Sequence, residues 1–432
     1  MKLRHFIPAV LAFAPALLAQ DHWVATWAAS PQQAAVFPPA AAQGATAPAQ
    51  RPPANAPQAP PRITSFNNQT VRMIIHASIG GRRARVQLSN AFGSGPLVIG
   101  AAHIALREKD SAIATGSDHP LLFNGKPSVT IPAGALMLSD PVDLTVPQLG
   151  DLAISVFIPG ESGTLTTHAT GLHTTFISKA GDFTSAPAIE DATTTRSWYW
   201  ISSVDVMAPP EAAAIVTFGD SITDGATSTV DADRSWPAFL AARLAANPAT
   251  AKLAVLNEGI SGNRLLRDNA GQNALARLDR DVLSQPAVKW MTLLEGINDI
   301  GRASGPGAPA TEAVTSDDLI GAMRQIIQRA HAHGIKVIGC TLTPYAGATY
   351  YSEAGEVMRQ EVNRWIRTGG AFDAVVDFEA VVRDPSNPKQ FRPDFNERDH
   401  LHPNDAGYKA MAEAFDLGIF GGKTVSTSAS AR

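Results

Sequence analysis

The chain has 432 residues, of which 45% are hydrophobic and 17% charged, as is typical of a globular protein with room for two or three domains. A net charge of -4 offers no positive field for a phosphate backbone, so we expect no nucleic acid partner. Cys340 is the only cysteine, which excludes an intrachain disulfide and a zinc site built from cysteines. It follows an apolar, strand-like segment, and this context predicts a buried, unreactive thiol.

Residues 1–20 have the composition of a secretory signal peptide. Lys2 and Arg4 precede an apolar run from Phe6 to Ala19, which is too short for a membrane span and contains several small residues. We expect cleavage at the end of this run and a secreted or periplasmic protein with no stable membrane insertion. An N-terminal core helix is the alternative, but two prolines inside the run disfavour it.

Residues 21–207 predict an all-β domain, most simply a sandwich. Short strand-like segments such as 71–76, 84–89 and 152–158 are separated by turns that contain Gly and Pro. The stretch from about 31 to 62 is dominated by Ala, Pro and Gln and cannot bury a core. We interpret it as a disordered insertion, with a proline-rich ligand for a partner as the alternative.

From about residue 211 to 420, apolar strands alternate with amphipathic helices. The candidate strands are Ala214–Phe218, Leu253–Leu256, Val288–Leu294, Val337–Leu342 and Ala374–Val376, and the candidate helices are Trp236–Leu244, Asp318–His331 and Tyr351–Ile366. Repeated βα units predict a three-layer α/β domain whose parallel sheet binds ligands beyond the carboxyl ends of its strands. Residues 421–432 are predicted to be a disordered tail.

The first of these strands runs directly into Gly219, Asp220 and Ser221, which places a serine at its carboxyl end. A serine hydroxyl is a poor nucleophile unless a base and an oxyanion site accompany it. Taken alone, Ser221 could simply cap the helix that follows.

A candidate base lies near the C-terminus in the segment Asp399-His400-Leu401-His402. An aspartate three residues before a histidine, within a turn, can hold the imidazole in one tautomer and leave Nε2 free to take the proton of Ser221. We therefore assign Asp399 as the orienting group and His402 as the base. His400 is the rival base, but its side chain projects differently because it is adjacent to Asp399.

Candidate oxyanion donors follow the second and third strands. Gly262 allows its backbone N–H to approach a substrate, and Asn298 carries a side-chain amide that can donate. Together with the backbone N–H of Ser221 they would complete an oxyanion hole. We interpret Gly296 as an ordinary turn glycine.

Four short segments in this order resemble the SGNH subgroup of the GDSL esterases and lipases: residues 219–221, 260–263, 296–299 and 399–402. The resemblance covers roughly residues 211–420 and implies a flavodoxin-like fold. It implies that Ser221 is the nucleophile and an oxyanion donor, that Gly262 and Asn298 are the other donors, and that Asp399 and His402 complete the triad. It implies no metal or organic cofactor. The β-rich domain resembles one that precedes the esterase domain in some secreted bacterial members.

The remaining conspicuous side chains receive structural interpretations. Asp220 is expected to hold loops together and Asp224 to lie in a turn or on the surface. The histidines His168 and His173 are expected to be structural, and His331 and His333 solvated. For a group of aromatic residues we expect core or rim packing, with a sugar subsite as the alternative: Trp198, Trp200, Tyr345, Tyr350 and Tyr351.

Together these features predict a secreted serine esterase that hydrolyses carboxylic esters through an acyl-enzyme. The expected substrate is a short acyl ester, such as acetyl on a carbohydrate, because the protein is expected to be exported, carries an extra β domain and has no long apolar lid segment. Three alternatives remain open at this stage: a lipase or phospholipase, an acyltransferase with the same triad, and a non-catalytic glycan-binding protein.

Overall fold

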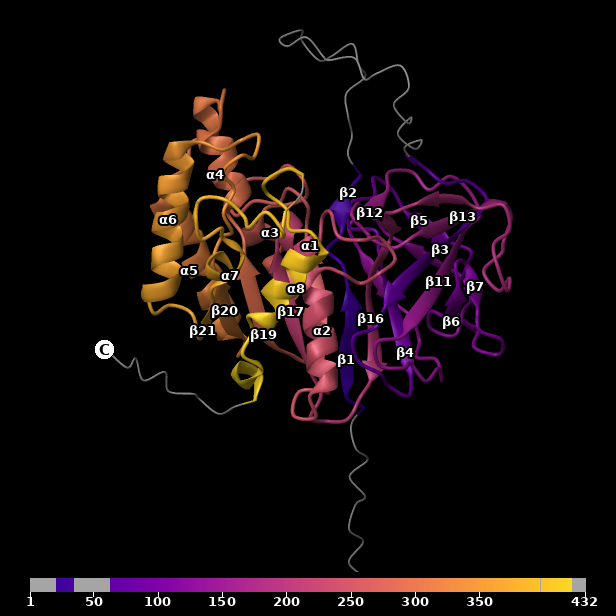
Figure 1. Ribbon diagram of the computed structural model, residues 1–432. Coiled ribbons are helices and arrows are strands. Elements are labelled where there is room, and N and C mark those ends of the chain that lie inside the picture. Colours follow the sequence, from indigo (N-terminus) through magenta and orange to yellow (C-terminus); the bar gives the residue numbers. More distant parts are fainter. Residues whose placement is uncertain (1–20, 35–62, 397, 422–432) are drawn as a thin grey trace, which may run out of the picture.

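The computed structural model describes residues 21–34, 63–396 and 398–421, which form two regions packed side by side (Figure 1). The predicted signal peptide, most of the predicted insertion and residues 422–432 of the predicted tail lie outside the described residues. The insertion was predicted to begin at about residue 31, which is too early. Gln32 and Gln33 form a short strand that pairs with residues 166–167, and Gln32 is buried there.

The N-terminal region is all-β and antiparallel, as predicted. One sheet has the order β1-β16-β4-β10, a second has β14-β13-β3-β11-β6-β7 with β8 beside β6, and the smaller sheets are β15-β12-β2 and β5-β9. The strands are β1 (Trp23–Ala28), β2 (Gln32–Gln33), β3 (Gln69–His76), β4 (Ala84–Ser89), β5 (Leu97–Ile99), β6 (Ala101–Lys109), β7 (Ala112–Ile113), β8 (His119–Pro120), β9 (Val129–Ile131), β10 (Leu136–Leu138), β11 (Asp151–Ile158), β12 (Thr166–His168), β13 (Thr175–Ala180), β14 (Thr193–Thr195), β15 (Trp198–Tyr199) and β16 (Ile201–Met207).

The C-terminal region contains a parallel sheet with the order β18-β17-β19-β20-β21. In chain order this is 2-1-3-4-5, the flavodoxin-like arrangement, so the predicted fold class is confirmed. The strands are β17 (Ala213–Gly219), β18 (Leu253–Gly259), β19 (Val288–Leu294), β20 (Lys336–Cys340) and β21 (Ala374–Val376). The predicted buried position of Cys340 is also confirmed, and burial raises the pKa of its thiol.

The helices of this region fall into two packed groups around the sheet (Figure 1). One group contains α2, α7 and α8, and the other contains α3 to α6. Right-handed crossovers account for α2 and for α3 to α6, because the chain reverses its direction across the sheet after β18, whereas α7 and α8 follow the last strand and α8 packs against α2. The bounds are α1 (Ser221–Asp224), α2 (Trp236–Ala246), α3 (Ala274–Leu278), a π-helical turn (Asp279–Leu283), α4 (Ile297–Ser304), a 3₁₀ turn (Ala310–Glu312), α5 (Ser316–Ala332), α6 (Glu353–Thr368), α7 (Phe378–Val382), α8 (Asp405–Glu413) and a last 3₁₀ turn (Leu417–Phe420).

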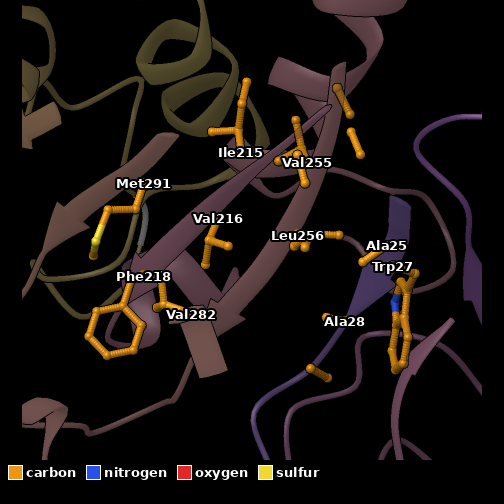
Figure 2. Packing of buried hydrophobic residues seen from close by; sticks show 14 of the residues in the cluster. Ala25, Trp27, Ala28, Ile215, Val216, Phe218, Val255, Leu256, Val282 and Met291 are labelled. Atoms are coloured by element: carbon orange, nitrogen blue, oxygen red, sulfur yellow. The ribbon is translucent and has the colours of Figure 1, made fainter. Parts of the chain in front are cut away.

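The two regions share one hydrophobic core. Strand β1 of the β-rich region packs against β18 at the edge of the parallel sheet. Figure 2 shows Ala25 and Trp27 of β1 beside Leu256 of β18, and all three belong to one cluster of buried side chains that spans both regions. Because burial of apolar surface stabilises by roughly 25 cal/mol per Å², this seam fixes the regions against each other.

The register of the sheet brings three strand ends together. Gly219 of β17 is paired with Gly259 of β18 on one side and with Leu294 of β19 on the other. The segments that begin at Asp220, Ile260 and Glu295 therefore leave the sheet at the same edge. Among the helices of the described residues, none is long and apolar enough to cross a membrane.

Candidate active site

Ser221 lies on a tight turn between β17 and α1. Every residue of β17 is buried, and Asp220 caps α1 by accepting the backbone N–H of Ile222 through Oδ1 at 2.9 Å. At Gly219 a Cβ would come within 2.5 Å of the Leu294 carbonyl oxygen, so only glycine permits this close approach of neighbouring strands. The turn delivers Ser221 to the edge of the sheet with 5% of its surface exposed.

Three of the predicted site residues form one hydrogen-bonded chain. The Ser221 hydroxyl lies 2.7 Å from His402 Nε2, and His402 Nδ1 lies 2.5 Å from Asp399 Oδ2. The other carboxylate oxygen, Asp399 Oδ1, accepts the backbone N–H groups of Leu401 and His402 at 3.0 and 2.9 Å. Although partial burial raises the pKa of Asp399, the hydrogen bonds from His402 outweigh it and hold that pKa below its ordinary value. The carboxylate is therefore charged and points at the imidazole.

The rival base His400 occupies a different position. Its backbone has a φ of +59°, its N–H donates to Asn396 Oδ1 at 3.1 Å, and its ring packs over Gly347. Within the described residues no hydrogen bond joins its ring to Ser221. The backbone turn thus directs His402, and not its neighbour, to the serine.

Asn298 and Gly262 lie on the loops that follow β19 and β18. Asn298 is the second residue of α4, and its Nδ2 donates to the Asn263 carbonyl at 3.0 Å. Because a carbonyl oxygen can only accept, this contact fixes which end of the amide carries the N–H groups, and the Oδ1 at the other end accepts the hydroxyl of Tyr350 at 3.3 Å. Gly262 has a φ of +81°, in the left-handed region that favours glycine. Gly296, with a φ of +121°, immediately precedes α4 and serves as the turn glycine that we expected.

A buried arginine ties these loops to the nucleophile turn. Arg277 donates through Nη2 to the Gly219 carbonyl and through Nε to Asn263 Oδ1, both at 2.9 Å. Its side chain has no exposed surface, and it forms an ion pair with Asp281 at 3.1 Å. A buried guanidinium has fixed donor directions, so it holds the strand end and the oxyanion loop in one geometry.

A family comparison identifies this region. The GDSL-like lipase/acylhydrolase family model matches residues 217–410, which include Ser221, Gly262, Asn298, Asp399 and His402. This chain contains a GDSL-like lipase/acylhydrolase domain. The domain, called the GDSL domain below, is a carboxylic ester hydrolase, as the sequence predicted.

Solved structures with similarity to this chain cover about half of it. They include a GDSL-like lipase from Bacteroides thetaiotaomicron, with 21% identity, a TM-score of 0.37, and coverage of 49% of this chain and 90% of that one. An alpha/beta hydrolase from the Lake Arreo metagenome has 22% identity, a TM-score of 0.39, and coverage of 49% and 96%. The acetylxylan esterase Axe2 from Geobacillus stearothermophilus has 22% identity, a TM-score of 0.38, and coverage of 49% and 95%. No curated protein matches this chain.

Asp224 of the GDSL domain was predicted to lie in a turn or on the surface, which is wrong. It is 3% exposed, its Oδ1 lies 3.0 Å from His168 Nε2 of the β-rich region, and its Oδ2 accepts two hydrogen bonds from Ser261. The sequence around Asp224 resembles an ordinary helix end, whereas His168 of the β-rich region and Ser261 together cover its carboxylate. A sequence signal for this contact is lacking, since His168 lies 56 positions earlier in the chain.

Five aromatic residues were considered for a sugar subsite, and in the described structure three of them are too buried to line one. Trp198, Trp200 and Tyr345 are 8%, 1% and 0% exposed and pack in the core. Tyr350 contacts Asn298 as described above, and the hydroxyl of Tyr351 donates to Glu353 at 2.9 Å.

A polar groove lies beside His402 on the outer face of the GDSL domain. It has a volume of about 400 Å³ and is lined mainly by polar and charged side chains: Thr227, Asp394, Arg398, His402, Asn404 and Asp405. Such a surface can hydrogen-bond a polar alcohol, whereas a long acyl chain requires an apolar wall.

One group of side chains has the composition of a metal site. His76, Asp151 and Asp233 offer ligand atoms that all lie within 4.8 Å of one another. Their charges are also compensated within the protein: Asp151 contacts His76 at 2.7 Å and Arg107 at 3.0 Å, and Asp233 contacts His173 at 2.9 Å. We interpret this group as an ion-pair network between the two regions, consistent with the structural role expected for His173.

Proposed function

We propose that the protein is a secreted serine esterase that hydrolyses short acyl esters of polar alcohols, such as acetyl groups on carbohydrates. The observation that carries the proposal is the chain from Ser221 through His402 to Asp399 at the carboxyl ends of the central strands, with the Asn298 amide on the next loop. A nucleophile, a base and an orienting carboxylate in one hydrogen-bonded chain support acyl transfer, and we assign the oxyanion donors to the loops that leave the same edge of the sheet.

In the proposed mechanism His402 Nε2 removes the proton of Ser221 while Oγ attacks the ester carbonyl. The oxyanion is held by the N–H groups of Ser221 and Gly262 and by the second amide hydrogen of Asn298. Collapse breaks the bond to the alcohol, which takes the proton from His402. Water, activated by the same imidazole, then releases the acid and restores Ser221. Asp399 stabilises the imidazolium in both steps without taking its proton.

The substrate class rests on the surroundings of His402. The groove beside His402 is polar and charged, which suits a hydroxyl-rich alcohol better than a lipid tail. Axe2, a structure with similarity to about half of this chain, is an acetylxylan esterase by name.

The test is a panel of esters with acetyl to palmitoyl chains and of acetylated polysaccharides, with Ser221→Ala as the matched control. We expect hydrolysis of acetyl esters by the wild type and none above background by Ser221→Ala. Activity on emulsified long-chain lipids with none on acetyl esters would contradict the substrate class and favour a lipase. Acyl transfer to an added alcohol that outcompetes water would instead indicate an acyltransferase.

The proposed location, outside the cytoplasm, rests on the N-terminal sequence. Lys2 and Arg4 before the apolar run from Phe6 to Ala19 have the order of charge and hydrophobicity that export machinery recognises. N-terminal sequencing of protein recovered from the medium or periplasm tests this proposal. A mature protein that starts near residue 20 supports it, and one that retains residue 1 in the cell contradicts it.

A further inference from the structure

The β-rich region supplies no group to the hydrogen-bonded chain from Ser221 to Asp399, yet three of its side chains contact elements that adjoin the serine turn and the oxyanion loop. Ser30, His168 and Thr170 contact Arg277, Asp224 and Ser261 of the GDSL domain, respectively. Each lies at a connection or strand end next to β2 or β12 and faces the catalytic edge of the parallel sheet.

His168 makes two hydrogen bonds across this interface. It is 3% exposed, Nδ1 lies 2.9 Å from the Ser30 carbonyl oxygen and Nε2 lies 3.0 Å from Asp224 Oδ1. Because both partners are acceptors, both ring nitrogens donate and the ring is an imidazolium. Burial lowers the pKa of His168, but the ion pair with Asp224 and the two hydrogen bonds outweigh it and raise that pKa above its ordinary value. Trp198 stacks on the ring with a centroid distance of 5.6 Å and limits its motion.

Asp224 transmits this contact to the oxyanion loop. Its Oδ2 accepts the backbone N–H of Ser261 at 2.8 Å and the Ser261 hydroxyl at 2.6 Å. Thr170 of the β-rich region donates to the same hydroxyl at 3.0 Å. Ser261 immediately precedes Gly262, so the peptide plane that carries the Gly262 N–H begins at a residue held by three hydrogen bonds.

A second contact reaches the opposite side of the loop. The Ser30 hydroxyl accepts a hydrogen bond from Arg277 Nη1 at 2.9 Å, and the same guanidinium holds Asn263 Oδ1 and the Gly219 carbonyl. Residues 261 and 263 are thus each fixed by a network that includes the β-rich region, and Gly262 lies between them.

We propose that the β-rich region is part of the catalytic apparatus, and that His168 and Thr170 are positioning residues that set the direction of the Gly262 N–H in the oxyanion hole. The proposal rests on the proposed esterase function. Oxyanion donors act only when they point at the position of the developing charge, and a shift of about 1 Å can cost about 100-fold in rate. Loss of the positioning contacts should therefore lower kcat and weaken transition-state analogues, with little change in KM.

The test compares four variants with the wild type at a temperature at which each is folded, as judged by its thermal melting curve. His168→Leu removes both donors, whereas His168→Gln keeps an N–H group close to the position of Nε2. Thr170→Val removes one hydroxyl at constant shape. Ser78→Ala is the matched control, because the Ser78 hydroxyl accepts the backbone N–H of Val255 across the same interface, four residues before the end of β18.

We expect kcat for an acetyl ester, and the affinity for a trifluoromethyl ketone that forms a tetrahedral adduct with serine, to fall about 10- to 100-fold in His168→Leu. The loss should be below about tenfold in His168→Gln and Thr170→Val, and Ser78→Ala should lower only the melting temperature. The inference is wrong if folded His168→Leu keeps wild-type kcat and analogue affinity, or if Ser78→Ala loses as much kcat as Thr170→Val. If the Ser221→Ala variant keeps the activity of the wild type, that result would instead contradict the proposed function itself.

Discussion

The two regions of the molecule differ in how their functional contacts are distributed along the chain. In the GDSL domain Asp399 and His402 lie three residues apart, and the serine turn directly follows a strand. In the β-rich region, Ser30, His168 and Thr170 are dispersed among strands and touch partners up to 247 positions away. The spacing of residues along the sequence therefore points to the catalytic residues of the GDSL domain. The residues of the β-rich region that contact the site are revealed only by the three-dimensional packing.

The largest expected effect lies in the GDSL domain. Asp399→Asn keeps the size of the side chain but removes the charge that faces His402 Nδ1, so the imidazole loses its tautomer control. We expect kcat to fall by on the order of 10⁴-fold with an unchanged melting temperature. Steady-state kinetics with an acetyl ester measure this, and a loss below tenfold would assign the orienting role to another group.

The next effect concerns the oxyanion site. Asn298→Ala removes one donor and leaves the Tyr350 hydroxyl without its acceptor. Removal of one such donor costs about 10²- to 10³-fold in kcat, and we expect a loss of this size with little change in KM. Asn298→Asp, which has the same shape but is an acceptor when charged, should be at least as inactive. An active Asn298→Asp would contradict the donor role.

Substitution of a buried residue of the β-rich region that lies away from the site should lower the stability of the protein but not its rate of catalysis. Arg72 is fully buried on β3 and donates to Ser155 Oγ at 2.8 Å and to carbonyl oxygens of residues 111, 183, 184 and 186. Arg72→Leu leaves these acceptors unpaired, and we expect the free energy of unfolding in urea to fall by about 3 kcal/mol. At a temperature where the variant is folded, kcat should stay within about twofold of the wild type. A larger loss would mean that the β-rich region influences the site through more than the contacts around His168.

Asp220 makes the free energy of unfolding of the protein depend on pH. It has no exposed surface, and burial raises its pKa from 3.8 to about 7. Between these two pH values the folded state binds more protons than the unfolded state, so this group makes the free energy of unfolding decrease as the pH rises from about 4 to about 7. Asp220→Asn mimics the protonated carboxyl and removes the dependence.

Urea unfolding of wild type and Asp220→Asn at pH 5 and pH 8 measures this difference. We expect Asp220→Asn to gain stability relative to the wild type at pH 8, with a smaller gain or none at pH 5. A gain of equal size at both pH values would show that Asp220 is already charged at pH 5.

Much of the GDSL domain could be predicted from the sequence, because strands and helices there carry regular apolar patterns and each motif follows a strand end. The five strands and the residues brought together at 221, 399 and 402 were anticipated in this way. Asp224 was misplaced because its burial depends on a histidine of another region, and the contact of Tyr350 with Asn298 was not anticipated because these residues lie 52 positions apart. The start of the insertion was misjudged because Gln32 is polar, yet it is held by strand pairing.

The central claim is that Ser221 is the nucleophile that carries the acyl group. The most direct measurement is the intact mass of the full chain after rapid acid quench of a reaction with an acetyl ester, followed by peptide mapping, in wild type and Ser221→Ala. The account predicts an added acetyl group on the peptide that contains Ser221 in the wild type, and neither acetylation nor turnover in Ser221→Ala. Turnover that persists in Ser221→Ala, or acetylation at a different residue, would contradict it.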